Sequence, residues 1–179
     1  RPRRERRFPL SLYSSSVPQF QKMLRLLETW LDKAEAHAAA KKYDPAILLQ
    51  ARLAPDMFPL IRQIQAACDA AEGAAAHLAG REPPKHPDTE TTLPEIRERV
   101  KTVLAYLDTV TEKDFEGAAD RRVGLGFLPG KVIVGQEYLI ELALPNFYFH
   151  VTMTYAILRH NGIDLGKRDF IGGLRLMDA

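Results

Sequence analysis

An asparagine and a histidine four residues apart are the side chains of this sequence best suited to chemistry. Asn146 and His150 lie in the otherwise largely apolar stretch PNFYFHVTMTYAILRHNG. On a helix they share a stripe with Leu139, Met153 and Ile157, so both are expected to point towards the core. Buried imidazole and amide groups need hydrogen-bond partners or a metal ion, because an unsatisfied group costs about 1 to 3 kcal/mol. The pair therefore marks a candidate site.

Helical periodicity predicts four long helices around this pair. Apolar residues repeat at helical spacing over residues 17–42, 55–78, 92–107 and 136–161. The expected boundary signals are Ser16 as an N-cap, Thr92 with Glu95 as a capping box, and Gly162 as a left-handed C-cap. Pro145, inside the last helix, predicts a kink one turn before His150. Between the helices, residues 44–49 predict a short helical turn, residues 81–91 a proline-bearing loop, and VGLGFLPGKVIV a small β-hairpin.

The second predicted helix offers one glutamine to the interior. Gln63 lies at the edge of its apolar face, whereas Gln65, Asp69 and Glu72 are expected on the opposite side. Asp56 lies seven residues before Gln63 on the same edge. The outer face of the third helix carries cations that are expected to be solvated, namely Arg97, Arg99 and Lys101.

Composition indicates one ordinary globular domain. The chain has 179 residues, of which 46% are hydrophobic and 27% charged, and a formal net charge of +2. The lone Cys68 excludes an internal disulfide framework and favours an intracellular, cytoplasmic compartment. No apolar run is long enough to span a bilayer. The glycines around Gly130 lack the Gly-Lys-Ser/Thr of a P-loop, which excludes nucleotide binding by that route. The remaining histidines are interpreted as structural or solvated: His37, His77, His86 and His160.

The chain begins with five arginines and one glutamate between Arg1 and Arg7. We expect a flexible basic arm over residues 1–10, a bundle domain over 11–174 and a tail over 175–179. The arm is compatible with a solvated tail, with an organellar targeting remnant, and with a contact for nucleic acid or an assembly partner. The last helix carries a second apolar face, made of Ile140, Leu144, Phe147, Val151 and Leu158. This face is expected either to pack on the N-terminal arm and the GKRDFIGGL tail or to form a homodimer interface, of which we favour the homodimer.

Three passages carry a family resemblance: SLYSSSVPQF, ARLAPDMFPLIRQIQAACDAA and LPNFYFHVTMTYAILRHNGIDLGKRDFIGG. Through them the chain resembles the DinB/YfiT-like superfamily, in particular a branch with an uncharacterised domain. The resemblance implies an all-α four-helix bundle of the up-down-down-up type. It also implies a metal ion held by three histidines, whose positions fall here on Gln63, Asn146 and His150.

The resemblance and the residues together leave three functions open. The first is a small-molecule metalloenzyme that transfers a thiol or water, with His150 as ligand or general base and Gln63, Asn146 and Tyr155 at the substrate. Amides are weak ligands for Zn²⁺ or Ni²⁺, so the metal site is degenerate, although Asp56 would add a carboxylate. The second is a metal-free binding module for a small ligand. The third is a non-catalytic subunit of a larger assembly.

Overall fold

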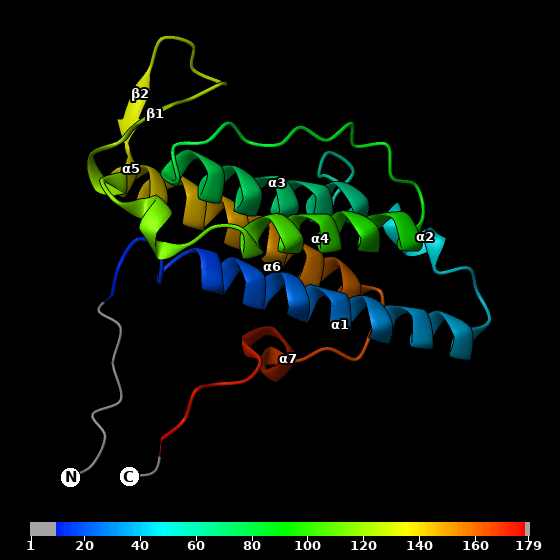
Figure 1. The fold of residues 1–179 in the computed structure, drawn as a ribbon. Helices are drawn as coiled ribbons and strands as arrows, with labels where there is room; N and C mark the ends of the chain where they lie inside the picture. Colours follow the sequence, from blue (N-terminus) through cyan, green and yellow to red (C-terminus); the bar gives the residue numbers. More distant parts are fainter. Residues whose placement is uncertain (1–9, 178–179) are drawn as a thin grey trace.

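Four long helices form the body of the protein in a computed structural model that describes residues 10–177. They are α1 (Val17–Lys41), α3 (Leu60–Leu78), α4 (Leu93–Asp108) and α6 (Leu144–His160). Helix α3 packs against α4 and α6, and α1 packs against the same two helices. Figure 1 shows α1 and α6 running in one direction and α3 and α4 in the other. The predicted all-α, up-down-down-up bundle is confirmed, whereas the arginines from Arg1 to Arg7 lie outside the described residues.

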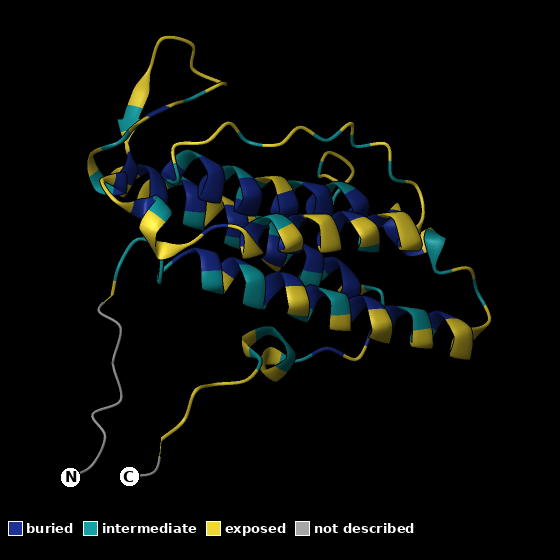
Figure 2. Ribbon diagram, in the orientation of Figure 1, coloured by how far each residue is buried: buried dark blue, intermediate teal, exposed yellow. Residues whose placement is uncertain are grey.

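The apolar faces of these helices meet in one core, as the dark blue inner surfaces in Figure 2 show. Its largest fully buried side chains include Trp30, Phe20 and Phe147. Burial of one such side chain contributes about 1.5 to 3 kcal/mol to folding. Among residues 10–177, no helix combines the length and the apolar character that a bilayer crossing requires.

Both ends of α1 agree with the prediction, with Ser16 in the N-cap position before Val17, but the Ser16 side chain makes no capping hydrogen bond. Its Oγ instead donates a hydrogen bond to the carbonyl oxygen of Leu12 at 2.6 Å. Pro18 occupies the first helical turn, where its missing N–H costs nothing. At the other end Lys42 adopts a left-handed conformation, with φ of 59°. The predicted short turn follows as α2 (Ala46–Leu49).

Helix α3 begins at Leu60, so the predicted start at Pro55 is wrong. Pro59 is the N-cap residue and has an extended ψ of 165°. A proline disfavours helical geometry in the residue before it, which separates residues 55–58 from the helix as a turn of their own. Asp56 therefore lies in this turn and is exposed.

The capping box of α4 is confirmed. The backbone N–H of Glu95 donates to Thr92 Oγ1 at 3.4 Å, and the N–H of Thr92 donates to Glu95 Oε2 at 2.9 Å. The long connection that leads into this cap crosses from one end of the bundle to the other, because α3 and α4 run in the same direction (Figure 1).

This crossover covers a face of α3 and α4 that the sequence assigns to solvent, and that assignment is wrong for Gln65, Glu72 and Arg99. Their exposed fractions are only 1%, 2% and 4%. Gln65 donates to Glu90 at 2.8 Å, and Arg99 forms ion pairs with Asp69 and with two carboxylates of the crossover. Glu72 contacts His86 Nε2 at 2.6 Å, so His86 is not the freely solvated loop residue expected. The crossover supplies the polar partners that this face requires.

The predicted hairpin is confirmed by two antiparallel strands, β1 (Arg122–Gly124) and β2 (Val132–Val134), with Val123 opposite Ile133. Two short 3₁₀ helices, η1 (Glu112–Phe115) and η2 (Ala118–Asp120), precede them. A helical turn, α5 (Gly135–Glu137), follows the hairpin. Between α5 and α6 lies η3 (Tyr138–Ala143), which is a π-helical segment.

The π-helical segment lies where the sequence predicts a kink. Pro145 has no N–H for the carbonyl of Glu141, which an α-helix would pair four residues later. A π turn pairs carbonyls five residues later, which removes that conflict. The segment also breaks the helical phase between Leu139 and Asn146, so these residues no longer share a face.

The prediction that Asn146 and His150 face the core is wrong, because the second apolar face of α6 meets the bundle. The core side of α6 carries Phe147, Val151 and Leu158, each 0% exposed, which belong to the face that the sequence assigns to a dimer. Asn146 is exposed and His150 is half-buried at the edge of the helix.

Beyond α6 the chain folds back over α1. Gly162 has a φ of 88° and forms the predicted left-handed cap. The short helix α7 (Lys167–Ile171) then lies beside α1 (Figure 1). Trp30 donates from its indole N–H to the carbonyl oxygen of Asp169 at 3.1 Å and stacks on Phe170, with 5.7 Å between ring centroids.

Candidate functional site

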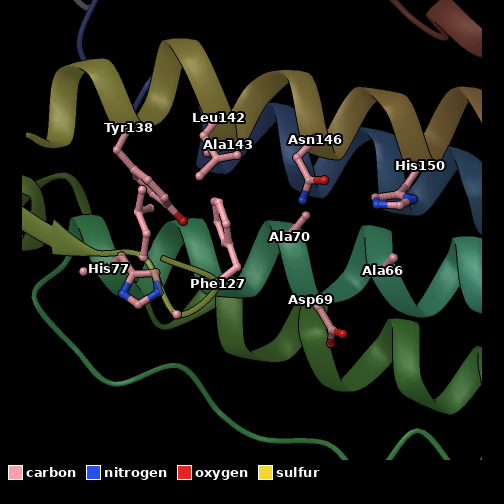
Figure 3. A pocket seen from close by; sticks show the side chains of 14 residues that line it. Ala66, Asp69, Ala70, His77, Phe127, Tyr138, Leu142, Ala143, Asn146 and His150 are labelled. Atoms are coloured by element: carbon pink, nitrogen blue, oxygen red, sulfur yellow. The ribbon is translucent and has the colours of Figure 1, made fainter. Parts of the chain in front are cut away.

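A groove of about 400 Å³ runs between α3 and α6 and ends under the hairpin. Figure 3 shows it from close by, with Asn146 and His150 on the side of α6 and Ala66 and Ala70 on the side of α3. From Ala66 to His77 the groove follows eleven residues of α3, or about 17 Å at about 1.5 Å per residue. A pocket of this volume suits a drug-sized molecule.

Small residues on α3 form the floor of the groove. Ala66, Ala70 and Gly73 follow one another at helical spacing along it. Glycine inside a helix is destabilising by about 0.5 to 1 kcal/mol relative to alanine. A Cβ atom at Gly73 would meet nothing within 4 Å, so packing does not require the glycine. Its effect is to leave the groove open.

We name the end of the groove at Asn146 and His150 the amide end. It is built on a hydrogen bond between Gln63 and His150. His150 Nδ1 lies 2.8 Å from Gln63 Oε1. The amide NH₂ of Gln63 donates to the carbonyl oxygen of Phe58 at 3.4 Å, which assigns the oxygen to the histidine side. Since an amide oxygen only accepts, Nδ1 carries the proton and Nε2 is the acceptor nitrogen.

His150 stays neutral more readily than an ordinary histidine. Burial lowers its pKa, and the nearby Arg62 guanidinium lowers it further. Nε2 has no hydrogen-bond partner among residues 10–177, and neither does the side chain of Asn146, one helical turn away. The amide end therefore presents a neutral imidazole acceptor beside an amide that both donates and accepts.

The opposite end, under the hairpin, is aromatic. Tyr138, His77 and Phe127 line it, and the rings of His77 and Tyr138 meet edge to face with centroids 5.8 Å apart. Burial raises the pKa of Tyr138 to about 12 and lowers the pKa of His77, so both side chains are uncharged at neutral pH. In Figure 3 the side chains of Tyr138 and Phe127 extend into the groove from opposite walls.

One charged residue lies between the two ends. Of the described residues that line the groove, Asp69 alone carries a formal charge, and it is paired with Arg99. Burial raises the pKa of this carboxyl, against the effect of Arg99, which lowers it. The remaining wall is uncharged.

The structure brings together some of the residues that the sequence predicts for the site. Gln63 and His150 are in contact, and Asn146 lines the groove one turn from His150. Asp56 lies in the exposed turn before α3 and outside the lining. Tyr155 also lies outside it, since its ring packs on Trp30 and its hydroxyl donates to Leu165.

Residues at the positions of the three histidines do not fit a transition metal. Two of them are neutral amides, and Gln63 Oε1 already accepts a hydrogen bond from Nδ1 of His150, the one imidazole among the three. Within residues 10–177, no group of three or more His, Cys, Asp or Glu side chains is arranged to hold a metal ion. Cys68 is fully buried and burial raises its pKa, so it offers no accessible thiolate ligand or nucleophile.

Sequence reasoning missed the aromatic end of the groove. Tyr138 and His77 were not candidates, because the phase break in the π-helical segment turns Tyr138 towards α3 and no periodic pattern predicts it. Phe127 lies in the hairpin loop and is 67% exposed. An aromatic residue between glycines in LGFLPG is the one signal that points to it.

Comparisons with known proteins agree with this architecture. The model of the family DUF1993, described as a domain of unknown function, matches residues 12–171. A crystal structure of a DinB family member protein from Shewanella denitrificans is 48% identical. The match covers 94% of this chain and 96% of that chain, with a TM-score of 0.90. No curated protein matches the chain.

Proposed function

Because the chain belongs to the DUF1993 family and has a DinB-like helical bundle, we propose that it binds a small uncharged molecule in the groove between α3 and α6 without a metal ion. The observation that carries the proposal is the hydrogen bond from His150 to Gln63. It satisfies the amide of Gln63, which stands where the resemblance implies a metal-ligating histidine. It also leaves His150 Nε2 free to accept a hydrogen bond. The pair is thus arranged as a receptor for a polar group.

The amide end sets the chemistry of that group. A primary amide of a ligand can donate to His150 Nε2 and accept from the NH₂ of Asn146 at the same time. Such a ligand is favoured over an analogue that lacks the N–H donor. The analogue would leave His150 Nε2 without a hydrogen bond, at a cost of about 1 to 3 kcal/mol. The groove therefore supports recognition of uncharged donor–acceptor groups such as amides.

Catalysis receives less support than binding. The described residues of the groove include no nucleophile that is hydrogen-bonded to a base, and His77 and His150 line opposite ends of it. Two imidazoles so far apart cannot act on one reacting atom, because general acid–base partners must lie within hydrogen-bond reach of it. For this reason we favour the binding module over the metalloenzyme.

Benzamide tests the proposal as a minimal amide probe. We expect millimolar binding to the metal-free protein, followed by chemical-shift changes in nuclear magnetic resonance spectra, because so few atoms give only weak affinity. Ala70→Leu fills the groove beneath Asn146 and should weaken binding at least tenfold. The matched variant Ala70→Ser keeps the groove open and should retain binding.

Equal affinities of the two Ala70 variants would place benzamide elsewhere and overturn the proposal. Leucine is nearly as good a helix former as alanine, so Ala70→Leu should remain folded. Its thermal midpoint provides the check.

The homodimer stays a prediction. Phe147, Val151 and Leu158 are buried within the monomer, and the side chains of the outer face that support dimerisation are Ile140 and Phe149, 58% and 51% exposed. Sedimentation of wild type and Ile140→Glu tests it, with a dimer expected only for wild type.

A further inference from the structure

Phe127 packs against no other aromatic ring among the described residues. It is 67% exposed although its ring lines the groove, and it makes no ring contact within residues 10–177. A planar molecule in the groove would cover this ring and remove its apolar surface from water, which favours binding. The loop thus presents an unused stacking surface.

The chain segment around Phe127 is shaped to bring that surface to the groove. Gly124, Leu125 and Gly126 line the groove together with Phe127, so the loop backbone itself forms part of the wall. Added Cβ atoms at Gly124 and Gly126 would meet nothing within 4 Å, so neither glycine is required by packing within the protein. Leu125 N–H donates to the carbonyl oxygen of Lys131 at 3.3 Å, which ties the loop to the hairpin.

Tyr138 supplies the facing wall. It belongs to the π-helical segment, and such segments occur frequently at functional sites. Its ring is held edge to face by His77, and its hydroxyl has no hydrogen-bond partner among the described residues. The hydroxyl is therefore available to a polar substituent on the ring of a ligand.

We infer that the hairpin end of the groove is an aromatic subsite in which Phe127, Tyr138 and His77 hold a planar, uncharged ring of the ligand. This inference rests on the proposed function and adds the chemical class of the ligand: an elongated molecule with an aromatic ring at one end and an amide-like group at the other. Along α3 the wall extends from Ala66 to His77, or about 17 Å. A single small ring would fill only part of it.

The walls of the groove favour an uncharged ligand. His77 and Tyr138 are neutral at neutral pH, and Asp69 lies eight residues from His77, or about 12 Å along α3. The described residues that line the groove include no cation to pair with an anionic ring, which would lose part of its hydration there without compensation. Anions should therefore bind much more weakly than their uncharged analogues.

Two fluorescent dyes that differ by one charge test the subsite. N-phenylnaphthylamine is uncharged and has two linked aromatic groups, and anilinonaphthalene sulfonate is its sulfonated analogue. With the full chain we expect a fluorescence rise with the uncharged dye and at least tenfold weaker binding of the sulfonate. Phe127→Ala should weaken binding of the uncharged dye at least fivefold. Leu128→Ala, a neighbouring exposed loop residue outside the lining, should not change it.

Failure of this inference can be distinguished from failure of the proposed function. If benzamide binds at the amide end but the uncharged dye does not bind, or binds equally to wild type and Phe127→Ala, the aromatic subsite is overturned alone. Tighter binding of the sulfonate overturns it too. If neither benzamide nor the dye binds, the proposed function fails with it.

Discussion

Ligand binding at the amide end of the groove depends on the protonation of one residue, His150. The hydrogen bond to Gln63 places its proton on Nδ1, and burial together with Arg62 lowers its pKa. A cationic imidazole would lose the acceptor at Nε2 that we assign to the ligand. Binding of benzamide should therefore weaken as the pH falls through the pKa of His150.

The same pKa shift predicts a pH dependence of stability. The unfolded chain binds a proton at this residue near pH 6.5, whereas the folded chain resists it. The stabilisation is therefore complete above about pH 6.5 and is lost as the pH falls, by at most about 1.4 kcal/mol per pH unit for one imidazole. Urea unfolding between about pH 5 and pH 7 gives the free energy of unfolding at each pH. Plotted against pH, this free energy should have a less positive slope for His150→Gln than for wild type.

Comparison of the two proteins isolates His150 from the other titrating groups. His77 contributes in the same direction, because its pKa is also lowered by burial. Asp69 and Glu72 act in the opposite direction, since burial raises their pKa values. Identical slopes in wild type and variant would contradict the assignment of a neutral His150.

Gly73 provides a second prediction at the scale of single residues. Gly73→Ala should increase the free energy of unfolding by about 0.5 to 1 kcal/mol, because alanine is the better helix former and its Cβ would meet open space. Urea denaturation measures the change. Gly135→Ala is the contrast, since its Cβ would clash with the carbonyl oxygen of Ala118 and should destabilise. A loss of stability in Gly73→Ala would show that the glycine has a packing role.

At the scale of elements, the crossover between α3 and α4 is held by a buried arginine. The side chain of Arg99 is 2% exposed and pairs with Asp69, Asp88 and Glu90. Arg62 adds a second pair to Asp88 at 2.6 Å. Because Asp69 also lines the groove, this network fixes the groove wall as well as the crossover.

Removal of that arginine should be costly. Arg99→Leu removes a guanidinium that is itself buried and that pairs with three partly exposed carboxylates, so it is expected to destabilise by about 1.5 to 3 kcal/mol. Arg97→Leu, two residues earlier on α4, loses pairs with Asp32 and Glu35, and because the Arg97 side chain is itself 18% exposed it should cost about 1 kcal/mol or less. Thermal or urea unfolding compares them. Similar losses would argue against a buried network at Arg99.

The elements also explain which predictions succeed. Caps and helical repeats depend on neighbours in sequence, so α1, α4, the hairpin and the Gly162 cap follow from local pattern. Burial of Arg99 depends on a crossover whose path no local pattern specifies. The exposure of Asn146 depends on which of the two apolar faces of α6 meets the bundle, and helical periodicity alone does not choose between them.

At the scale of the whole molecule, the bundle could be predicted because each helix buries a clear apolar face and three passages resemble the DinB-like superfamily. The meeting of Gln63 with His150 is implied by the same resemblance, which assigns both residues to one site. The aromatic end of the groove could not be predicted, because Phe127 and Tyr138 line the same groove only when the hairpin folds against the end of the bundle. Tertiary arrangement, and no single element, creates the groove.

The most direct test of the metal-free groove is the nitrogen spectrum of the His150 ring in chelator-treated protein, recorded with and without benzamide. With no metal present, we expect a neutral ring with the proton on Nδ1. Addition of benzamide should shift the Nε2 resonance. A ring that responds to benzamide only after Zn²⁺ or Ni²⁺ is supplied would contradict this expectation.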